Sequence, residues 1–148
     1  GFRIRQPEGG ALIFLDTNIC IYALKGIYPS IARNMRQHSS DSIFIPSIVK
    51  AELLYGARKS RNPEETLEKV SDFIFPFEIV PFDDEATTVY ADIRTELEKA
   101  GQPIGPNDLI IAATVLSRHG TLITHNAGEF GRIGALDLDD WCEQEGDR

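Results

Sequence analysis

Short apolar runs alternate with segments of helical pattern along this chain, and this alternation narrows the folds that it can adopt. The runs lie at residues 11–15, 42–45, 78–82 and 121–124, and a fifth is expected at 135–138. They are too short for helices and lack a polar residue at every second position. Strands of this kind are buried on both faces. The pattern therefore predicts a three-layer α/β/α sandwich with a short, mainly parallel sheet of about five strands.

Turn and cap residues mark the helices between these runs. Gly26 and Pro29 are expected to end the first helix, Ser47 to cap the third, and Pro63 and Pro106 to open two others. The helices predicted on this basis are 17–25, 30–37, 47–60, 64–75, 83–100, 106–119 and 127–133.

The size and composition of the chain are those of one ordinary globular domain, with 148 residues, 42% of them apolar and 26% charged. No apolar run reaches the roughly 18 residues of a membrane span, and residues 1–10 lack the apolar core of a signal peptide. The two cysteines, Cys20 and Cys142, are far apart in the sequence and are expected to be reduced thiols, which favours a cytoplasmic location.

The net charge of −8 argues against broad binding of nucleic acid, because phosphates require cationic partners. The charge is unevenly distributed, however. Residues 25–61 hold seven lysines and arginines against two acids, whereas most of the acids follow residue 61. A basic stripe can therefore exist on this acidic protein, although ordinary solvated helix faces explain the same pattern equally well.

Three acidic residues occur next to expected core structure. Asp16 follows the first apolar run, in LIFLDTN, at the sheet edge where α/β folds bind ligands. On a helical wheel, Glu52 falls within an apolar stripe that includes Ile48 and Tyr55, so its charge needs compensation by a cation. Asp108 lies in the first turn of a buried helix, where the helix dipole explains it as well as catalysis does.

A polar turn follows the fourth apolar run, in the sequence LITHNAGEF. His125 in this turn is expected to be a local hydrogen-bonding residue, while Asn126 and Glu129 border the next helix. Carboxylates from three elements, without His or Cys among them, suit a hard cation such as Mg²⁺ or Mn²⁺. Such cations promote cleavage of phosphodiesters.

Four motifs, in this order and spacing, resemble the PIN domain and within it the VapC-type ribonuclease toxins of type II toxin–antitoxin systems. They are FLDTNICIYALKG at 14–26, IPSIVKAELLYGARKS at 45–60, PIGPNDLIIAATVLSRHGTLITHNAGEFGRI at 103–133 and DLDDW at 137–141. The resemblance covers residues 11–142 as one PIN domain. It leaves residues 1–10 as an N-terminal extension or a cloning remnant, and residues 143–148 as a C-terminal tail.

The resemblance also implies roles for individual residues. Asp16, Glu52 and Asp108 are expected to hold Mg²⁺ or Mn²⁺. Many members of the family carry a fourth acid where this chain has Asn126, and Glu129, one helical turn further on, can substitute for it. Asn126 or Glu129 is expected to position the catalytic water or a second ion. The residues expected to orient these acids through hydrogen bonds are Thr17, Asn18 and Thr124.

The function implied by the resemblance is that of a metal-dependent endoribonuclease toxin. It would hydrolyse phosphodiester bonds of a structured RNA such as tRNA, leave 3′-hydroxyl and 5′-phosphate ends, and so inhibit translation and growth. The resemblance further implies a homodimer that a VapB-type antitoxin neutralises within a larger assembly. Operator DNA would be bound only through the antitoxin, and no membrane is involved.

Two other interpretations of the same residues remain open at this point. A PIN-like module that binds RNA or protein without cutting is favoured by the amide at Asn126. A phosphatase could use Asp16 as a phosphorylated nucleophile, but Asn18 then stands where a second acid is expected.

Overall fold

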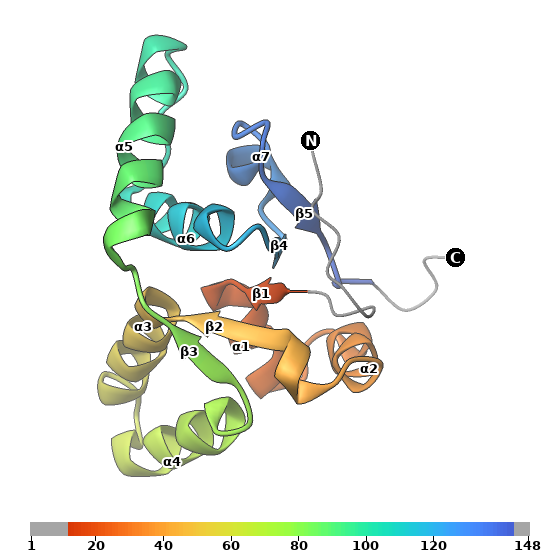
Figure 1. The fold of residues 1–148 in the computed structure, drawn as a ribbon. Helices are drawn as coiled ribbons and strands as arrows, with labels where there is room; N and C mark the ends of the chain where they lie inside the picture. The colour runs from red at the N-terminus through yellow and green to blue at the C-terminus, as the bar shows by residue number, and fades with distance from the viewer. Residues whose placement is uncertain (1–11, 144–148) are drawn as a thin grey trace.

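The computed structural model describes residues 12–143, whose strands form a five-stranded sheet with helices on both sides (Figure 1). The strands are β1 (Ile13–Leu15), β2 (Ile43–Pro46), β3 (Glu78–Val80), β4 (Thr121–Ile123) and β5 (Asp137–Asp139). Their order is β3-β2-β1-β4-β5, and every pairing in this part of the chain is parallel. The predicted α/β class and sheet are confirmed. The predictions for residues 1–10 and 144–148 lie outside the described residues.

The helices lie on two sides of the sheet because the chain reverses its direction across it. They are α1 (Thr17–Lys25), α2 (Pro29–Arg36), α3 (Ser47–Arg58), α4 (Pro63–Ile74), α5 (Asp84–Lys99), α6 (Pro106–Ser117) and α7 (Ala127–Phe130). Strand order runs outward from β1 to β3 and then returns past β1 to β4 and β5. Because crossovers between parallel strands are right-handed, this order assigns α1–α4 to one face and α5–α7 to the other. In Figure 1, α1–α4 gather in the lower part of the view and α5–α7 lie above β1.

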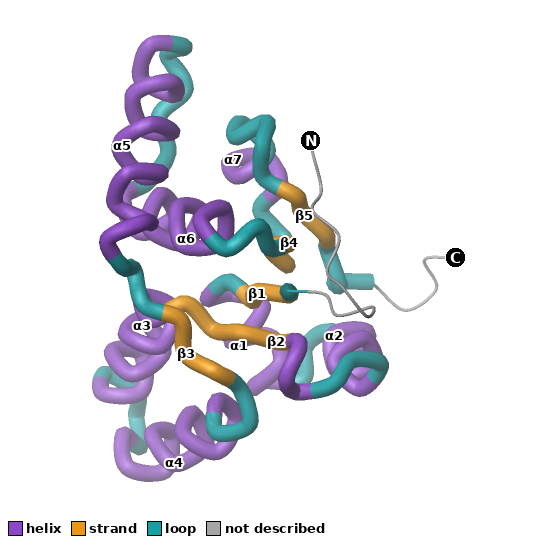
Figure 2. Tube along the Cα trace, in the orientation of Figure 1, coloured by secondary structure: helices purple, strands orange, loops and turns teal. Residues whose placement is uncertain are grey.

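The strands are shorter than most of the helices (Figure 2), and the central strand β1 is fully buried. Phe14 on β1 is 1% exposed and stacks on Phe44 of β2, with 5.4 Å between the ring centroids. Gly120, just before β4, lies against the same ring, and a Cβ at this position would be 2.4 Å from a ring carbon of Phe14. This close approach requires a glycine at position 120, where the chain enters β4 beside its neighbour β1.

Some predicted helix and strand ends differ from the structure. Ser47 was expected to be an N-cap, but it is the first residue of α3, and Pro46 occupies the cap position. The predicted end of the first helix is confirmed, since α1 ends at Lys25 with Gly26 as its C-cap. The second helix begins at Pro29, one residue before the predicted start, because a proline is tolerated in the first turn, where its missing N–H is not needed. The last strand is Asp137–Asp139 rather than 135–138.

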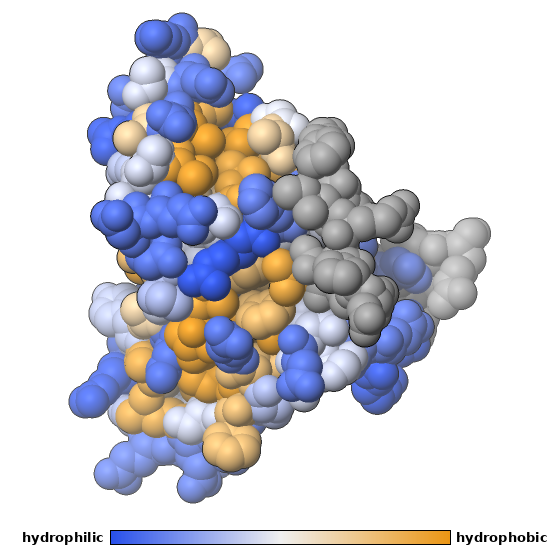
Figure 3. Space-filling view, viewed as in Figure 1, coloured by the Kyte–Doolittle hydropathy of each residue, from blue (hydrophilic) through white to orange (hydrophobic). Residues whose placement is uncertain are grey.

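Apolar side chains reach the surface on the face that Figure 3 shows, between α5 and the segment of α7 and β5. Val89, Ile93, Leu116 and Ala135 line a hollow in this region. No helix in the described part of the chain is long and apolar enough to cross a membrane.

The point at which strand order reverses lies between β1 and β4, which are adjacent in the sheet. Parallel α/β sheets bind ligands in the crevice at such a point, beyond the carboxyl ends of the strands. Asp16 directly follows β1, and Thr124 directly follows β4. The fold therefore brings the predicted polar residues of two distant motifs to one edge.

Candidate active site

Asp16 is held at the junction of β1 and α1. It is the N-cap of α1, and its Oδ1 accepts a hydrogen bond of 2.9 Å from the backbone N–H of Ile19. The side chain is buried, with an exposed fraction of 5%. Burial raises the pKa of this carboxyl, hydrogen bonds from Thr124 and Ile19 lower it, and the charges of Asp140 and Glu52 raise it further. Asp16 is therefore a rigidly oriented carboxylate in a site of negative potential.

Glu52 points from α3 toward α1 and α6. The hydroxyl of Thr17 donates a hydrogen bond to its Oε1 at 2.5 Å, and the amide of Asn107 donates one to its Oε2 at 2.9 Å. Both carboxylate oxygens are thus fixed by neighbours from other elements. Sequence reasoning missed Asn107, although this residue directly precedes Asp108 in the GPND motif.

The surroundings of Glu52 differ from the helical-wheel prediction. The buried residues of α3 are Val49, Leu53 and Ala57, spaced four apart, and Glu52 lies beside this stripe and is half-buried. Tyr55, expected within the apolar stripe, is 64% exposed. A spacing of four drifts around the helix, so the face that contacts the sheet is rotated from the one that the wheel predicted.

Asp108 lies in the first turn of α6 and contacts Glu129 of α7 through a hydrogen bond between the two carboxyl groups. Burial, this hydrogen bond and the charges of Glu129, Asp16 and Glu52 together raise the pKa of Asp108 to about 7. Two carboxyl groups in contact share a proton, since both cannot carry full charge at short range without a cation. Asp108 therefore titrates close to neutral pH.

The remaining predicted residues occupy different positions around this cluster. The hydroxyl of Thr124 accepts a hydrogen bond of 3.0 Å from the backbone N–H of Asn126, in addition to its bond with Asp16. Asn126 is the N-cap residue of α7, but its exposed side chain makes no cap hydrogen bond. Asn18 is exposed in the first turn of α1 and, within residues 12–143, has no side-chain hydrogen bond to the acids.

The four acids Asp16, Glu52, Asp108 and Glu129 come from four places in the sequence and influence one another electrostatically. Among the described residues, no lysine, arginine or histidine forms an ion pair with any of them. Asp16 is buried and the other three acids are half-buried, and a partly buried cluster of like charges is unfavourable unless a cation joins it. The oxygen-only donors and the charge without a cationic partner among the described residues fit a hard divalent cation. Water would supply some of its ligands, since no three of these acids have ligand atoms all within 4.8 Å of one another.

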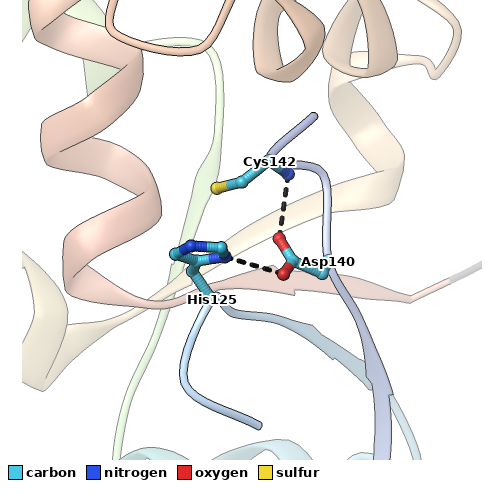
Figure 4. Close-up of side chains that lie close together, drawn as sticks. All are labelled: His125, Asp140 and Cys142. Carbon is cyan, nitrogen blue, oxygen red and sulfur yellow. Dashed lines mark hydrogen bonds and ion pairs between the residues drawn. The ribbon is translucent and has the colours of Figure 1, made fainter. Parts of the chain in front are cut away.

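A further group beside the acids was not predicted as a unit. His125 Nδ1 and Asp140 Oδ2 are 2.7 Å apart, and the backbone N–H of Cys142 donates to Asp140 Oδ1 at 2.8 Å (Figure 4). Burial raises the pKa of the Cys142 thiol to about 12, and the nearby carboxylates of Asp140 and Asp16 contribute to this increase. The sequence signals were His125 after β4 and the D-x-C spacing after β5, on neighbouring strands.

The family model of the PIN domain matches residues 13–136, so the chain belongs to the PIN-domain family. Ribonuclease VapC2 of Rickettsia felis is 41% identical over 131 residues, which cover 88% of this chain and 98% of the relative. The tRNA(fMet)-specific endonuclease VapC of Shigella flexneri is 38% identical and covers 86% and 96%. Within the family, this chain is a VapC-type ribonuclease, the toxin of a VapBC toxin–antitoxin system.

Solved structures agree with this assignment. The chain is similar to a chain in the complex of VapBC2 from Rickettsia felis with a DNA fragment from its promoter, with a TM-score of 0.82 and 40% identity over 87% of this chain and 98% of the other. It is also similar to a chain in DNA-bound VapBC from Salmonella typhimurium, with a TM-score of 0.85 and 38% identity over 89% and 99%. The alternative of a non-catalytic PIN-like module is set aside because relatives 41% and 38% identical to this chain are a ribonuclease and an endonuclease.

Proposed function

We propose that this ribonuclease cuts RNA with Mg²⁺ or Mn²⁺ held by Asp16, Glu52 and Asp108. The observation that carries the proposal is the convergence of these carboxylates with Glu129 at one sheet edge, without a compensating protein cation among the described residues. When bound, the metal would neutralise charge on the scissile phosphate and increase the acidity of a water molecule.

The chain's own residues would orient the acids and the water. Thr17 holds one oxygen of Glu52, and Asn107 holds the other, so this side chain cannot rotate away from the site. Thr124 holds Asp16 in the same way. Glu129, in contact with Asp108, would position the attacking water and take up its proton, while Asn126 would provide an amide nearby.

The reaction adds one water molecule across one phosphodiester bond. The water oxygen bonds to phosphorus while the bond from phosphorus to O3′ breaks, and O3′ takes up a proton. The products would carry a 3′-hydroxyl and a 5′-phosphate end.

The substrate class that we propose is structured tRNA. Relatives from Shigella flexneri and Salmonella typhimurium, 38% and 39% identical, are named tRNA(fMet)-specific endonucleases. On the surface of α3, one turn beyond Glu52, Tyr55 is 64% exposed, and Lys59 Nζ lies 4.7 Å from its ring centroid. An exposed aromatic ring beside a cation is suited to contact an unpaired base and its phosphate.

The partner that we propose is a VapB-type antitoxin, with operator DNA bound through it and a homodimer of this chain within the assembly. Similar chains occur in VapBC complexes with DNA. A groove lined by Ile21, Leu24, Leu53 and Val70 extends to Glu52 and offers apolar surface for a peptide beside the acids. We also propose a cytoplasmic location, where RNA and the antitoxin are available, and residues 11–142 as the extent of the domain.

The test is cleavage of initiator tRNA by the purified chain in Mg²⁺, with elongator tRNAs as competing substrates. Cleavage is expected to stop in EDTA and in Asp16→Asn, while Asp84→Asn, which changes an exposed first-turn acid of α5, keeps full activity. Glu129→Gln is expected to lose more activity than Asn126→Ala. Undiminished cleavage in EDTA or by Asp16→Asn would contradict the proposal, and a failure to cleave both initiator and elongator tRNAs would contradict the substrate assignment.

A further inference from the structure

A second group of metal-ligand side chains lies beside the acidic site but differs from it chemically. His125 comes from the turn between β4 and α7, and Asp140 and Cys142 come from the segment after β5. One ligand atom of each of the three lies within 4.8 Å of the others. Among residues 12–143, this is the one set of three or more His, Cys, Asp or Glu side chains that meets this criterion.

The ligand atoms of this group are a nitrogen, an oxygen and a sulfur. Imidazole and thiolate are ligands of Zn²⁺ and similar cations, whereas Mg²⁺ and Ca²⁺ take oxygen ligands. The group is therefore expected to discriminate between cations in a different way from the carboxylates of Asp16, Glu52 and Asp108. It has no part in the cleavage reaction proposed above.

The distances between the three ligand atoms are already close to those around a bound zinc ion. In a tetrahedral zinc site with bonds of about 2.0–2.3 Å, neighbouring ligand atoms lie roughly 3.3–3.7 Å apart. The observed spacing of 2.7 Å between His125 and Asp140, and of up to 4.8 Å within the group, brackets these values. Changes of about 1 Å in these distances would give the three ligand atoms the spacing of a tetrahedral site.

The surroundings restrict these side chains. The carboxylate of Asp140 is held by the backbone N–H of Cys142, and the ring of His125 packs near Tyr22 and Tyr28, at centroid distances of 6.4 and 5.6 Å. Figure 4 shows the sulfur, the imidazole and the carboxylate facing one another. The negative charge of Asp16 nearby also favours a cation at this position.

We infer that His125, Asp140 and Cys142 form a binding site for a zinc-class divalent cation, with a fourth position open to water. Three protein ligands with one open position are typical of exchangeable zinc sites. Such an ion would join the turn after β4 to the segment after β5, which is already attached to α2 through the hydroxyl of Ser30. Binding would stabilise the folded chain by mass action.

The test uses Co²⁺ as a spectroscopic substitute for Zn²⁺ on the reduced, metal-free full chain. The expected result, apart from any Co²⁺ that the carboxylates of the acidic site hold, is one thiolate-bound equivalent of Co²⁺ per chain, with a thiolate-to-cobalt charge-transfer absorption and the visible bands of a tetrahedral ion. Excess Mg²⁺ should leave this spectrum unchanged, and Zn²⁺ should abolish it by displacing Co²⁺. Absence of the charge-transfer band in the wild-type chain would overturn the inference.

Variants locate the ion. Cys142→Ser and His125→Ala are expected to weaken Co²⁺ binding at least about 10-fold, since even the loss of an outer-shell partner has an effect of this size. Cys20→Ala is the matched control, because Cys20 is the other free cysteine of the described chain and is fully buried. Asp108→Asn tests the acidic site in the same way, and both controls should keep the band.

The alternative outcomes are distinguishable. The inference would be overturned if the band survives in Cys142→Ser. It would also be overturned if the band disappears in a Cys20→Ala chain that circular dichroism shows to be folded, because the thiolate ligand would then lie elsewhere. Loss of the band in folded Asp108→Asn would place the ion among the catalytic carboxylates, with the same consequence. If the wild-type chain shows the normal cobalt spectrum but does not cleave RNA in Mg²⁺, that result would count against the proposed catalytic site alone.

Discussion

Replacement of Asp108 by asparagine is expected to stabilise the metal-free protein above neutral pH, although the same change should abolish RNA cleavage. Asp108 contacts Glu129 and lies near the charges of Asp16 and Glu52, and its pKa is raised from 3.8 to about 7. An ionised Asp108 is therefore repelled by three other carboxylates. Asparagine keeps the shape of the side chain and removes this repulsion.

The direction of the pH effect follows from proton binding. Between about pH 4 and pH 7 the folded chain keeps a proton on Asp108 that the unfolded chain has released. Stability from this group is therefore complete below about pH 4, declines as pH rises and is lost above about pH 7. The free energy of unfolding of Asp108→Asn should lack this decline.

The magnitude is limited by solvent. A pKa that rises from 3.8 to about 7 corresponds to at most about 4 kcal/mol without screening. Because Asp108 is only half-buried, water screens these charges, and we expect about 1–2 kcal/mol at pH 8. For a domain of this size that is a rise in Tm of roughly 3–8 °C.

The assay is thermal unfolding followed by circular dichroism from pH 4 to pH 8, in EDTA and in saturating Mg²⁺. Asp84→Asn is the matched control, since Asp84 also lies in the first turn of a helix but is exposed. It should lose about 0.3–1 kcal/mol of helix-dipole stabilisation and keep the pH dependence. In Mg²⁺ the wild type should gain more stability than Asp108→Asn. If Asp108→Asn in EDTA at pH 8 is no more stable than the wild type, and declines equally with pH, the repulsion argument is refuted.

Two further substitutions examine the support of the site and of the sheet. Thr17→Val removes the hydrogen bond to Glu52. A hydrogen bond to a charged group contributes about 1.5–3 kcal/mol, so the folded variant should cleave RNA roughly 10- to 100-fold more slowly. Unchanged cleavage would contradict this role of Thr17. Gly120→Ala places a Cβ against the ring of Phe14 and should lower the free energy of unfolding, measured in urea, by about 1–3 kcal/mol. Gly134→Ala is the control, because a Cβ there meets nothing within 4 Å. Equal effects of the two substitutions would argue against overpacking at Gly120.

Local sequence patterns predicted most of the fold, since they depend on neighbouring residues. The apolar runs identified the strands, and Pro63 and Pro106 marked the first residues of α4 and α6. The run before Asp16 also predicted a carboxylate at a strand end. The face of α3 was predicted less well, because burial there depends on how the helix rests against its neighbours.

Contacts between distant residues were beyond such patterns. The amide of Asn107 meets Glu52, 55 residues away, and His125 meets Asp140 across the β4–β5 edge. The sequence shows the members of each pair but not that they meet, because α3 and α6 come together only in the folded chain and β4 and β5 become neighbours only through the sheet order. The same order explains why Asp140 contributes to the electrostatic environment of Asp16.

The sequence by itself determined the class of fold, its parallel sheet and the acids that belong at the strand ends, because periodicity and strand position are local properties. Only the tertiary structure decided that Glu129 contacts Asp108, that Thr17 and Asn107 hold Glu52, and that a histidine, an aspartate and a cysteine form a separate group. These arrangements depend on the reversal of strand order beside β1, which brings together segments that are far apart in the sequence.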